Sequence, residues 1–145
     1  MAQKRLPVQV HLSTEHTGED GAVERQQLTA KGDGWLHSDQ WVVRFVEQET
    51  GRDPVMTTIK AKEHQLTLIR RGGVTMRQVF DPAMETRGRY EHPYGQLEMI
   101  TKTEHLHRSK RKEGWRMEWV YHLHLNGVEA GTFHITLTVK PEKME

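Results

Sequence analysis

Hydrophobic and polar residues alternate one by one over long stretches of the chain. Along residues 133–139, Phe133, Ile135, Leu137 and Val139 are separated by single polar residues, and residues 6–12 show a similar alternation. Because successive side chains of a β-strand point to opposite faces, this pattern predicts strands with one apolar face. A period near 3.6, which would indicate amphipathic helices, is nearly absent. We therefore expect an all-β protein.

Short turn-forming segments divide the chain into nine or ten expected strands. No segment long enough for a crossover helix separates them, so sequential antiparallel pairing is expected. Closing such a meander into a barrel removes its unpaired edges. The prediction is one domain over residues 1–145, an antiparallel meander β-barrel of about 8–10 strands. Residues 81–95, which contain two prolines, are expected to be its one long loop.

The apolar faces of the last strands predict their register. In residues 115–125 and 133–139 the apolar side chains occupy odd positions. A two-residue turn at Asn126-Gly127 would pair odd with even positions and turn one apolar face outward. We therefore expect a three-residue loop with Gly127 in the left-handed conformation. For the preceding hairpin, odd positions are expected to face odd positions, with His107 opposite Trp115.

Composition narrows the classes of function. Lys plus Arg number 21 and Asp plus Glu number 20, for a formal net charge of +1. Such a balance predicts no long-range field for a nucleic acid or a membrane. The chain has no cysteine, which excludes disulfides and thiol catalysis. Without a long apolar run or a signal-peptide core, a soluble cytoplasmic protein is expected.

Sequence motifs for catalysis are weak. The three serines, Ser13, Ser38 and Ser109, lie in no Gly-x-Ser-x-Gly turn. His37, Ser38 and Asp39 are consecutive, so in an extended chain they point to different faces and cannot form a relay. No catalytic residue and no cofactor are predicted, and a non-enzymatic role is favoured.

Ten histidines raise the question of a metal site. The pairs His105/His107 and His122/His124 each place two imidazoles on one face of a strand, a spacing that metal sites in β-barrels use. However, the first pair belongs to the odd, apolar face and the second to the even, polar face. The two pairs point apart unless a β-bulge intervenes, so no metal site is predicted.

The inward face of the long strands gives the leading functional hypothesis. A mainly apolar pocket with a few polar groups is typical of small-ligand sites, although the same side chains could simply fill a narrow barrel. We expect non-enzymatic binding of a small apolar or aromatic molecule in the lumen, with aromatic walls and Thr103 and His105 as polar anchors. The residues predicted to line this site are Thr101, Thr103, His105, Trp115, Trp119 and Tyr121.

A basic segment supports a second hypothesis from another class. Residues 108–112 contain four cations in five positions, namely Arg108, Lys110, Arg111 and Lys112. Such a loop could dock RNA or an acidic protein partner through its charge. Glutamates flank the segment, which weakens its local field, so the hypothesis is ranked second.

Several motifs resemble those of a known family. They are Arg71-Gly72-Gly73, Met76-x-x-x-Phe80, Tyr90-x-x-Pro93-x-Gly95, Thr103, and Tyr121-x-Leu123 before Asn126-Gly127. This combination resembles the YwiB-like family, a bacterial domain of unknown function with a calycin-like, lipocalin-shaped barrel. The resemblance implies that fold and no particular activity. His92 departs from the family pattern, which has Thr there. We expect Tyr90, His92, Pro93 and Tyr94 to belong to a loop lying over one barrel end.

Overall fold

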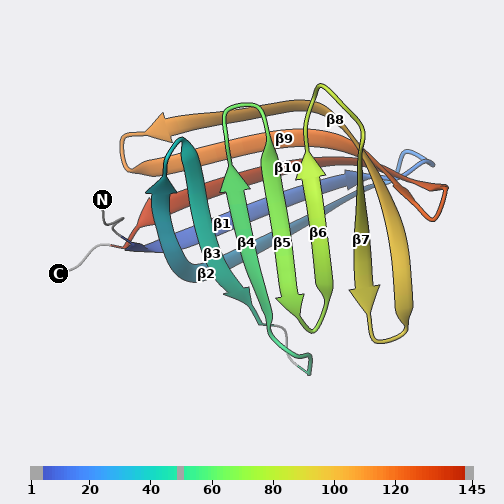
Figure 1. Cartoon of the computed structure of the whole chain (residues 1–145), viewed down its shortest axis with the longest axis horizontal. Coiled ribbons are helices and arrows are strands. Elements are labelled where there is room, and N and C mark those ends of the chain that lie inside the picture. Colours follow the sequence, from blue (N-terminus) through green and yellow to red (C-terminus); the bar gives the residue numbers. More distant parts are fainter. Residues whose placement is uncertain (1–4, 49–50, 143–145) are drawn as a thin grey trace.

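Ten antiparallel strands form the whole of the described structure. The computed structural model describes residues 5–48 and 51–142 (Figure 1). The strands are β1 (Leu6–Thr17), β2 (Val23–His37), β3 (Gln40–Glu47), β4 (Val55–Ala61), β5 (Leu66–Gly72), β6 (Thr75–Phe80), β7 (Thr86–His92), β8 (Gly95–Arg111), β9 (Gly114–Leu125) and β10 (Val128–Pro141). Each strand pairs with the next, and β1 pairs with β10 to close a barrel. The predicted all-β meander barrel is confirmed.

The barrel consists of two crossed layers. In Figure 1, β3 to β7 run vertically at the front, whereas β1, β9 and β10 run across behind them. Strand β8 pairs with β7 at its start and with β9 over most of its length, so it belongs to both layers. Among the described residues, no helix is long and apolar enough to cross a membrane.

The last hairpin reaches the expected alignment by a different route. Asn126 and Gly127 form a two-residue turn, with φ angles of 48° and 80°, and Leu125 pairs with Val128. The predicted three-residue loop is therefore wrong. A β-bulge between Glu129 and Gly131 supplies the extra residue instead, and beyond it Tyr121 pairs with Phe133. Odd positions face odd positions, because a bulge just after the turn shifts the register as a longer loop would.

A second bulge changes the hairpin of β8 and β9. Thr101 pairs with Leu123 and Thr103 with Tyr121, but the register shifts between Thr103 and His105. Beyond this bulge Lys110, not His107, lies opposite Trp115, so that prediction is wrong. The extra residue, Glu104, transfers the inward positions of β8 from odd to even numbers.

Residues 81–95 are not one long loop, as the sequence predicted. They contain strand β7, which pairs with β6 and β8. Pro82 and Pro93 both lie in turns outside this strand. Gly88 lies within it, where an added Cβ would come 2.5 Å from the carbonyl oxygen of Arg77. The glycine that suggested a loop instead permits close approach of two strands.

Large side chains occupy the interior of the barrel. The largest fully buried ones include Trp119, Phe45, Phe80, Ile59, Leu66, Met117 and Leu137. The ring of Phe80 contacts those of Trp119 and Tyr121, with centroids 5.6 Å and 4.7 Å apart. Aromatic contact at these distances indicates a packed core around the inward face of β9.

Candidate functional site

Four of the predicted lumen residues lie together on the inward face of β8 and β9. Thr101, Thr103, Trp119 and Tyr121 are all buried, with exposed fractions of 1%, 5%, 2% and 8%. Thr103 and Tyr121 are direct partners across the two strands. Trp119 is the inward residue of β9 that precedes Tyr121, so it lies diagonal to Thr103. The alternation along β9 therefore located these side chains correctly.

Strand β6 contributes a polar residue that the sequence analysis missed. Gln78 is 4% exposed, and its Nε2 donates a hydrogen bond of 2.9 Å to Thr101 Oγ1. Burial raises the pKa of the Tyr121 phenol above its ordinary range, while a hydrogen bond with Gln78 acts in the opposite direction. The phenol is therefore neutral at physiological pH. Gln78 occupies the inward position between Met76 and Phe80, which are both buried. The alternation along β6 could therefore have identified Gln78 as an inward residue.

Two polar atoms in this wall have no partner among the described residues. The Thr103 hydroxyl and the Trp119 indole N–H are both buried without a hydrogen bond. An unpaired buried polar group costs about 1–3 kcal/mol, so most such groups in proteins are satisfied. The inward face of β8 and β9 thus combines aromatic surface with an unused hydroxyl and an unused N–H donor.

The other two predicted lumen residues do not belong to this fully buried group. The bulge at Glu104 turns His105 to the outer face, where its side chain is 53% exposed. The prediction that His105 anchors a lumen ligand is therefore wrong. Trp115 is half-buried, and its ring stacks on that of Trp41 at 5.3 Å. It packs against the core from the part of β9 nearest Gly114.

Glu118 is the centre of the polar cluster that His105 joins on the outer face. One carboxylate oxygen of Glu118 lies 3.6 Å from His105 Nε2, and the other lies 3.5 Å from His134 Nε2. Arg116 Nη2 is 3.3 Å from Glu118. Burial acts to raise the pKa of Glu118, but His134, His105 and Arg116 together lower it. The cluster therefore surrounds one carboxylate with an arginine, which forms an ion pair, and two imidazoles.

The described residues contain no group of three or more His, Asp or Glu side chains placed to hold a metal ion. His122 Nδ1 instead lies 2.9 Å from Thr132 Oγ1, and His122 Nε2 lies 3.8 Å from Glu104. His105, His122 and His134 therefore serve as partners of neighbouring polar groups.

The residues expected over one barrel end instead form the hairpin between β7 and β8. His92 pairs with Gly95, and Pro93 and Tyr94 form the turn. Tyr90 is half-buried and packs against the core, whereas Tyr94 is 94% exposed. The prediction that a loop holds Tyr94 and Pro93 against the barrel end is wrong, because this tight hairpin projects its tip into solvent.

The basic residues of segment 108–112 separate into two groups. Arg108 Nη1 donates hydrogen bonds to the carbonyl oxygens of Asp39 and Ala61, at 2.7 Å and 2.9 Å. Its guanidinium carbon also lies 4.6 Å from the centre of the Trp41 ring. Arg108 is thus part of the barrel structure, while Lys110, Arg111 and Lys112 are exposed near the tip of the hairpin.

Comparisons with known proteins agree with this architecture. The chain is 23% identical over 137 residues to the uncharacterised β-barrel protein YwiB of Bacillus subtilis (strain 168). This alignment covers 94% of each chain. The crystal structure of the ywiB protein from Bacillus subtilis superposes with a TM-score of 0.86, covering 98% of this chain and 96% of that one. The family model of a domain of unknown function, DUF1934, matches residues 10–137. The chain therefore belongs to the DUF1934 family of β-barrel domains.

Proposed function

We propose that the protein is a non-enzymatic binding protein whose lumen takes up a small, mainly apolar molecule with a hydrogen-bond acceptor. The single observation that carries this proposal is the pair of unpartnered polar atoms, Thr103 Oγ1 and Trp119 Nε1, on the inward face of β8 and β9. Each of these groups can donate a hydrogen bond to a carbonyl or ether oxygen of a ligand. Binding would then remove the cost of leaving them unpaired.

The surroundings of this pair restrict the ligand. The Phe80 ring contacts the rings of Trp119 and Tyr121, and Met117 on the same face of β9 is fully buried. This packing favours a compact molecule over a long lipid chain. The neutral phenol of Tyr121 and the absence of a charged group among the four inward residues favour an uncharged ligand.

Native mass spectrometry of the protein purified from its own host tests the proposal. The wild-type protein is expected to carry an additional mass, which the double variant Thr103→Val/Trp119→Phe loses because both polar atoms are removed. His105→Gln is the matched control, since His105 lies on the outer face, and it should keep the mass. A wild-type protein with the mass of the bare polypeptide, or a double variant with the same additional mass, would overturn the proposal.

Fewer cations of segment 108–112 are available to a partner in the structure than the sequence suggested, which weakens the hypothesis that this segment docks RNA or an acidic protein. Arg108 donates hydrogen bonds to two backbone carbonyls and contacts the Trp41 ring, so Lys110, Arg111 and Lys112 are the cations of this segment left for a partner. A single hairpin tip with three cations offers a small surface for an RNA or an acidic protein.

A further inference from the structure

The outer face of β4, β5 and β6 carries cations without the usual interspersed carboxylates. The outward side chains of β4, β5 and β6 are Met56, Thr58, Lys60, Thr67, Ile69, Arg71, Thr75, Arg77 and Val79. This set contains three cations and no acidic residue. For a chain with a net charge of only +1, the arrangement concentrates positive charge on one face.

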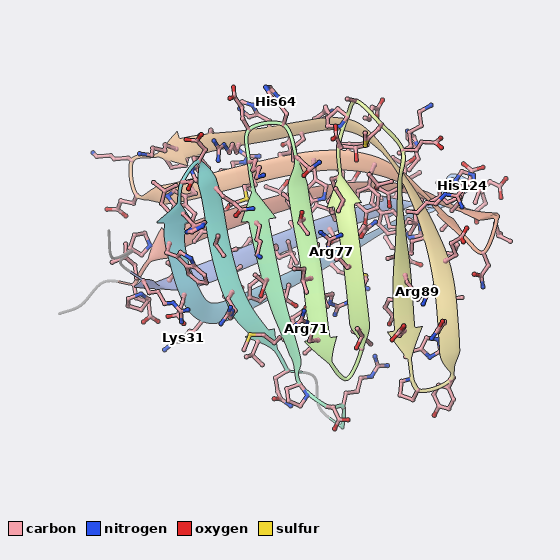
Figure 2. The ribbon with its side chains drawn as sticks, viewed as in Figure 1. Lys31, His64, Arg71, Arg77, Arg89 and His124 are labelled. Carbon is pink, nitrogen blue, oxygen red and sulfur yellow. The ribbon has the colours of Figure 1, made fainter. Side chains whose placement is uncertain are left out.

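Two arginines of this face are direct cross-strand partners. Arg77 pairs with Ile69 of β5 on one side and with Arg89 of β7 on the other. Figure 2 shows Arg71, Arg77 and Arg89 distributed across this layer. All three are exposed, and none forms an ion pair with another described residue. Their charges are therefore available to an external anion.

These side chains line two connected grooves. The larger, of about 700 Å³, is lined in part by Arg71, Arg77, Arg87 and Arg89. The smaller, of about 330 Å³, is lined by Arg44, Met56, Thr58, Lys60, Ile69 and Arg71. Ile69 and Arg71 belong to both. The basic residues that line the two grooves, from Arg44 on β3 to Arg87 and Arg89 on β7, form a cationic band. This band spans four strand spacings, or about 19 Å.

Two carboxylates reduce this charge without cancelling it. Glu98 lies 3.8 Å from Arg87, a loose and exposed pair, and Glu91 lines the end of the larger groove. Both lie on the β7–β8 side of the band. The part of the band formed by Lys60, Arg71 and Arg77 has no carboxylate among the outward side chains of β4, β5 and β6, so its positive charge is not reduced there.

An exposed aromatic residue stands where this groove ends. Glu91 and Gln96, which line the groove, also flank the tip of the β7–β8 hairpin. At this tip Tyr94 is 94% exposed, and the rings of Tyr90, His92 and Tyr94 follow one another at centroid distances of 5.6 Å and 6.0 Å. Full exposure of a tyrosine beside a cationic groove provides a stacking surface for a planar group.

We propose that this face binds single-stranded nucleic acid. Guanidinium groups match phosphate geometry and pair with it by two parallel hydrogen bonds. A charged groove with an adjacent exposed ring is the combination that binds single strands without sequence preference. An acidic peptide would use the arginines but would leave Tyr94 without a stacking partner, so the aromatic tip favours a nucleic acid. The site is independent of the lumen.

Fluorescence anisotropy with a labelled oligouridylate of about twelve nucleotides tests the proposal. With Arg71, Arg77, Arg87 and Arg89 engaged, log affinity should fall against log salt with a slope near −2.8. The triple variant Arg71→Gln/Arg77→Gln/Arg89→Gln leaves one of these cations, so the slope should fall to about −0.7 and binding at low salt should be largely lost. Tyr94→Ala should weaken binding about tenfold while preserving the slope.

The matched control removes the same charge elsewhere. Lys110→Gln/Arg111→Gln/Lys112→Gln changes three exposed cations of the β8–β9 hairpin and should leave the affinity within about twofold of wild type. Because all six residues are exposed, both triple variants should unfold at the wild-type temperature. If the arginine triple does fold poorly, Arg77→Gln alone should still reduce the slope by about 0.7.

Several results would overturn the proposal. One is the absence of binding to the oligouridylate at low salt. A second is loss of binding in the hairpin triple but not in the arginine triple, which would place the site at the hairpin tip. A third is equal competition by poly-glutamate, which would indicate an acidic protein partner, and a fourth is tighter binding of a duplex of the same length.

Discussion

His105 Nε2 lies 3.6 Å from Glu118 Oε1 on the outer face of the barrel. The alternation of β8 by itself would place His105 in the lumen. The extra residue Glu104 reverses the direction of every side chain that follows it, which brings His105 onto the same face as Glu118. A single inserted residue therefore decides whether this imidazole belongs to the candidate ligand site or to a surface ion-pair cluster.

Replacing Glu118 with Gln should produce a stability difference that depends on pH. The folded-state pKa of Glu118 lies below its ordinary value of 4.5, because the effects of His134, His105 and Arg116 outweigh that of burial. A carboxylate with a lowered pKa stabilises the folded protein above the unfolded-state pKa, and this contribution disappears as the pH falls through the folded-state value. Urea unfolding should show Glu118→Gln less stable than wild type near neutral pH, by roughly 0.5–1 kcal/mol, and this difference should vanish as the pH falls through the folded-state pKa. A difference that stays constant over this range would show that charge plays no part.

Gly127 and Gly131 should respond very differently to substitution by alanine. Both have positive φ angles, 80° and 103°. An added Cβ at Gly127 meets nothing within 4 Å, whereas at Gly131 it would lie 2.3 Å from the carbonyl oxygen of Thr17. Gly127→Ala should lower the free energy of unfolding by about 1 kcal/mol through backbone strain, and Gly131→Ala by about 3 kcal/mol or more through strain and overpacking. Equal losses in chemical denaturation would argue against the bulge next to Gly131.

Arg108 should be important for stability, in contrast to the cations that follow it. Arg108→Ala removes two hydrogen bonds to carbonyl oxygens and the contact with Trp41, and should lower the free energy of unfolding by about 2–3 kcal/mol. Lys110→Ala, two residues along on the exposed part of the hairpin, should change it by less than about 0.5 kcal/mol. Thermal unfolding of the two variants checks this. Similar midpoints would show that Arg108 is a surface residue after all.

The sequence was sufficient for the fold and for the inward face of β9. Strict alternation marks Met117, Trp119, Tyr121 and Leu123 as one face, and the structure buries all four. Bulges were harder to detect, because the pattern is regular on each side of them. In β8 the only signal was that the inward apolar position moves from odd to even numbers at Leu106.

The pairing of residues from distant segments could not be deduced from the pattern. The hydrogen bond from Gln78 to Thr101 joins β6 to β8, and the cationic face requires the register of four strands at once. Both depend on long-range alignment, which local alternation does not contain. The exposed hairpin at Tyr94 was missed because Pro82, Gly88 and Pro93 looked like the composition of one loop.

If the barrel keeps the Thr103 hydroxyl unpaired for a ligand, two matched variants should show it most directly. Thr101 and Thr103 are both buried on β8, but only Thr101 has a partner, the Gln78 amide. In ligand-free protein, Thr103→Val should raise the free energy of unfolding by about 1–2 kcal/mol, because it removes an unsatisfied polar group. Thr101→Val should lower it by about 1–3 kcal/mol, because it leaves Gln78 unpaired. A gain in stability at Thr103 would mean that the native residue is retained at a cost, as expected of a binding site. Destabilisation by Thr103→Val comparable to that of Thr101→Val would contradict the claim, since it would show that the Thr103 hydroxyl is already satisfied in the free barrel.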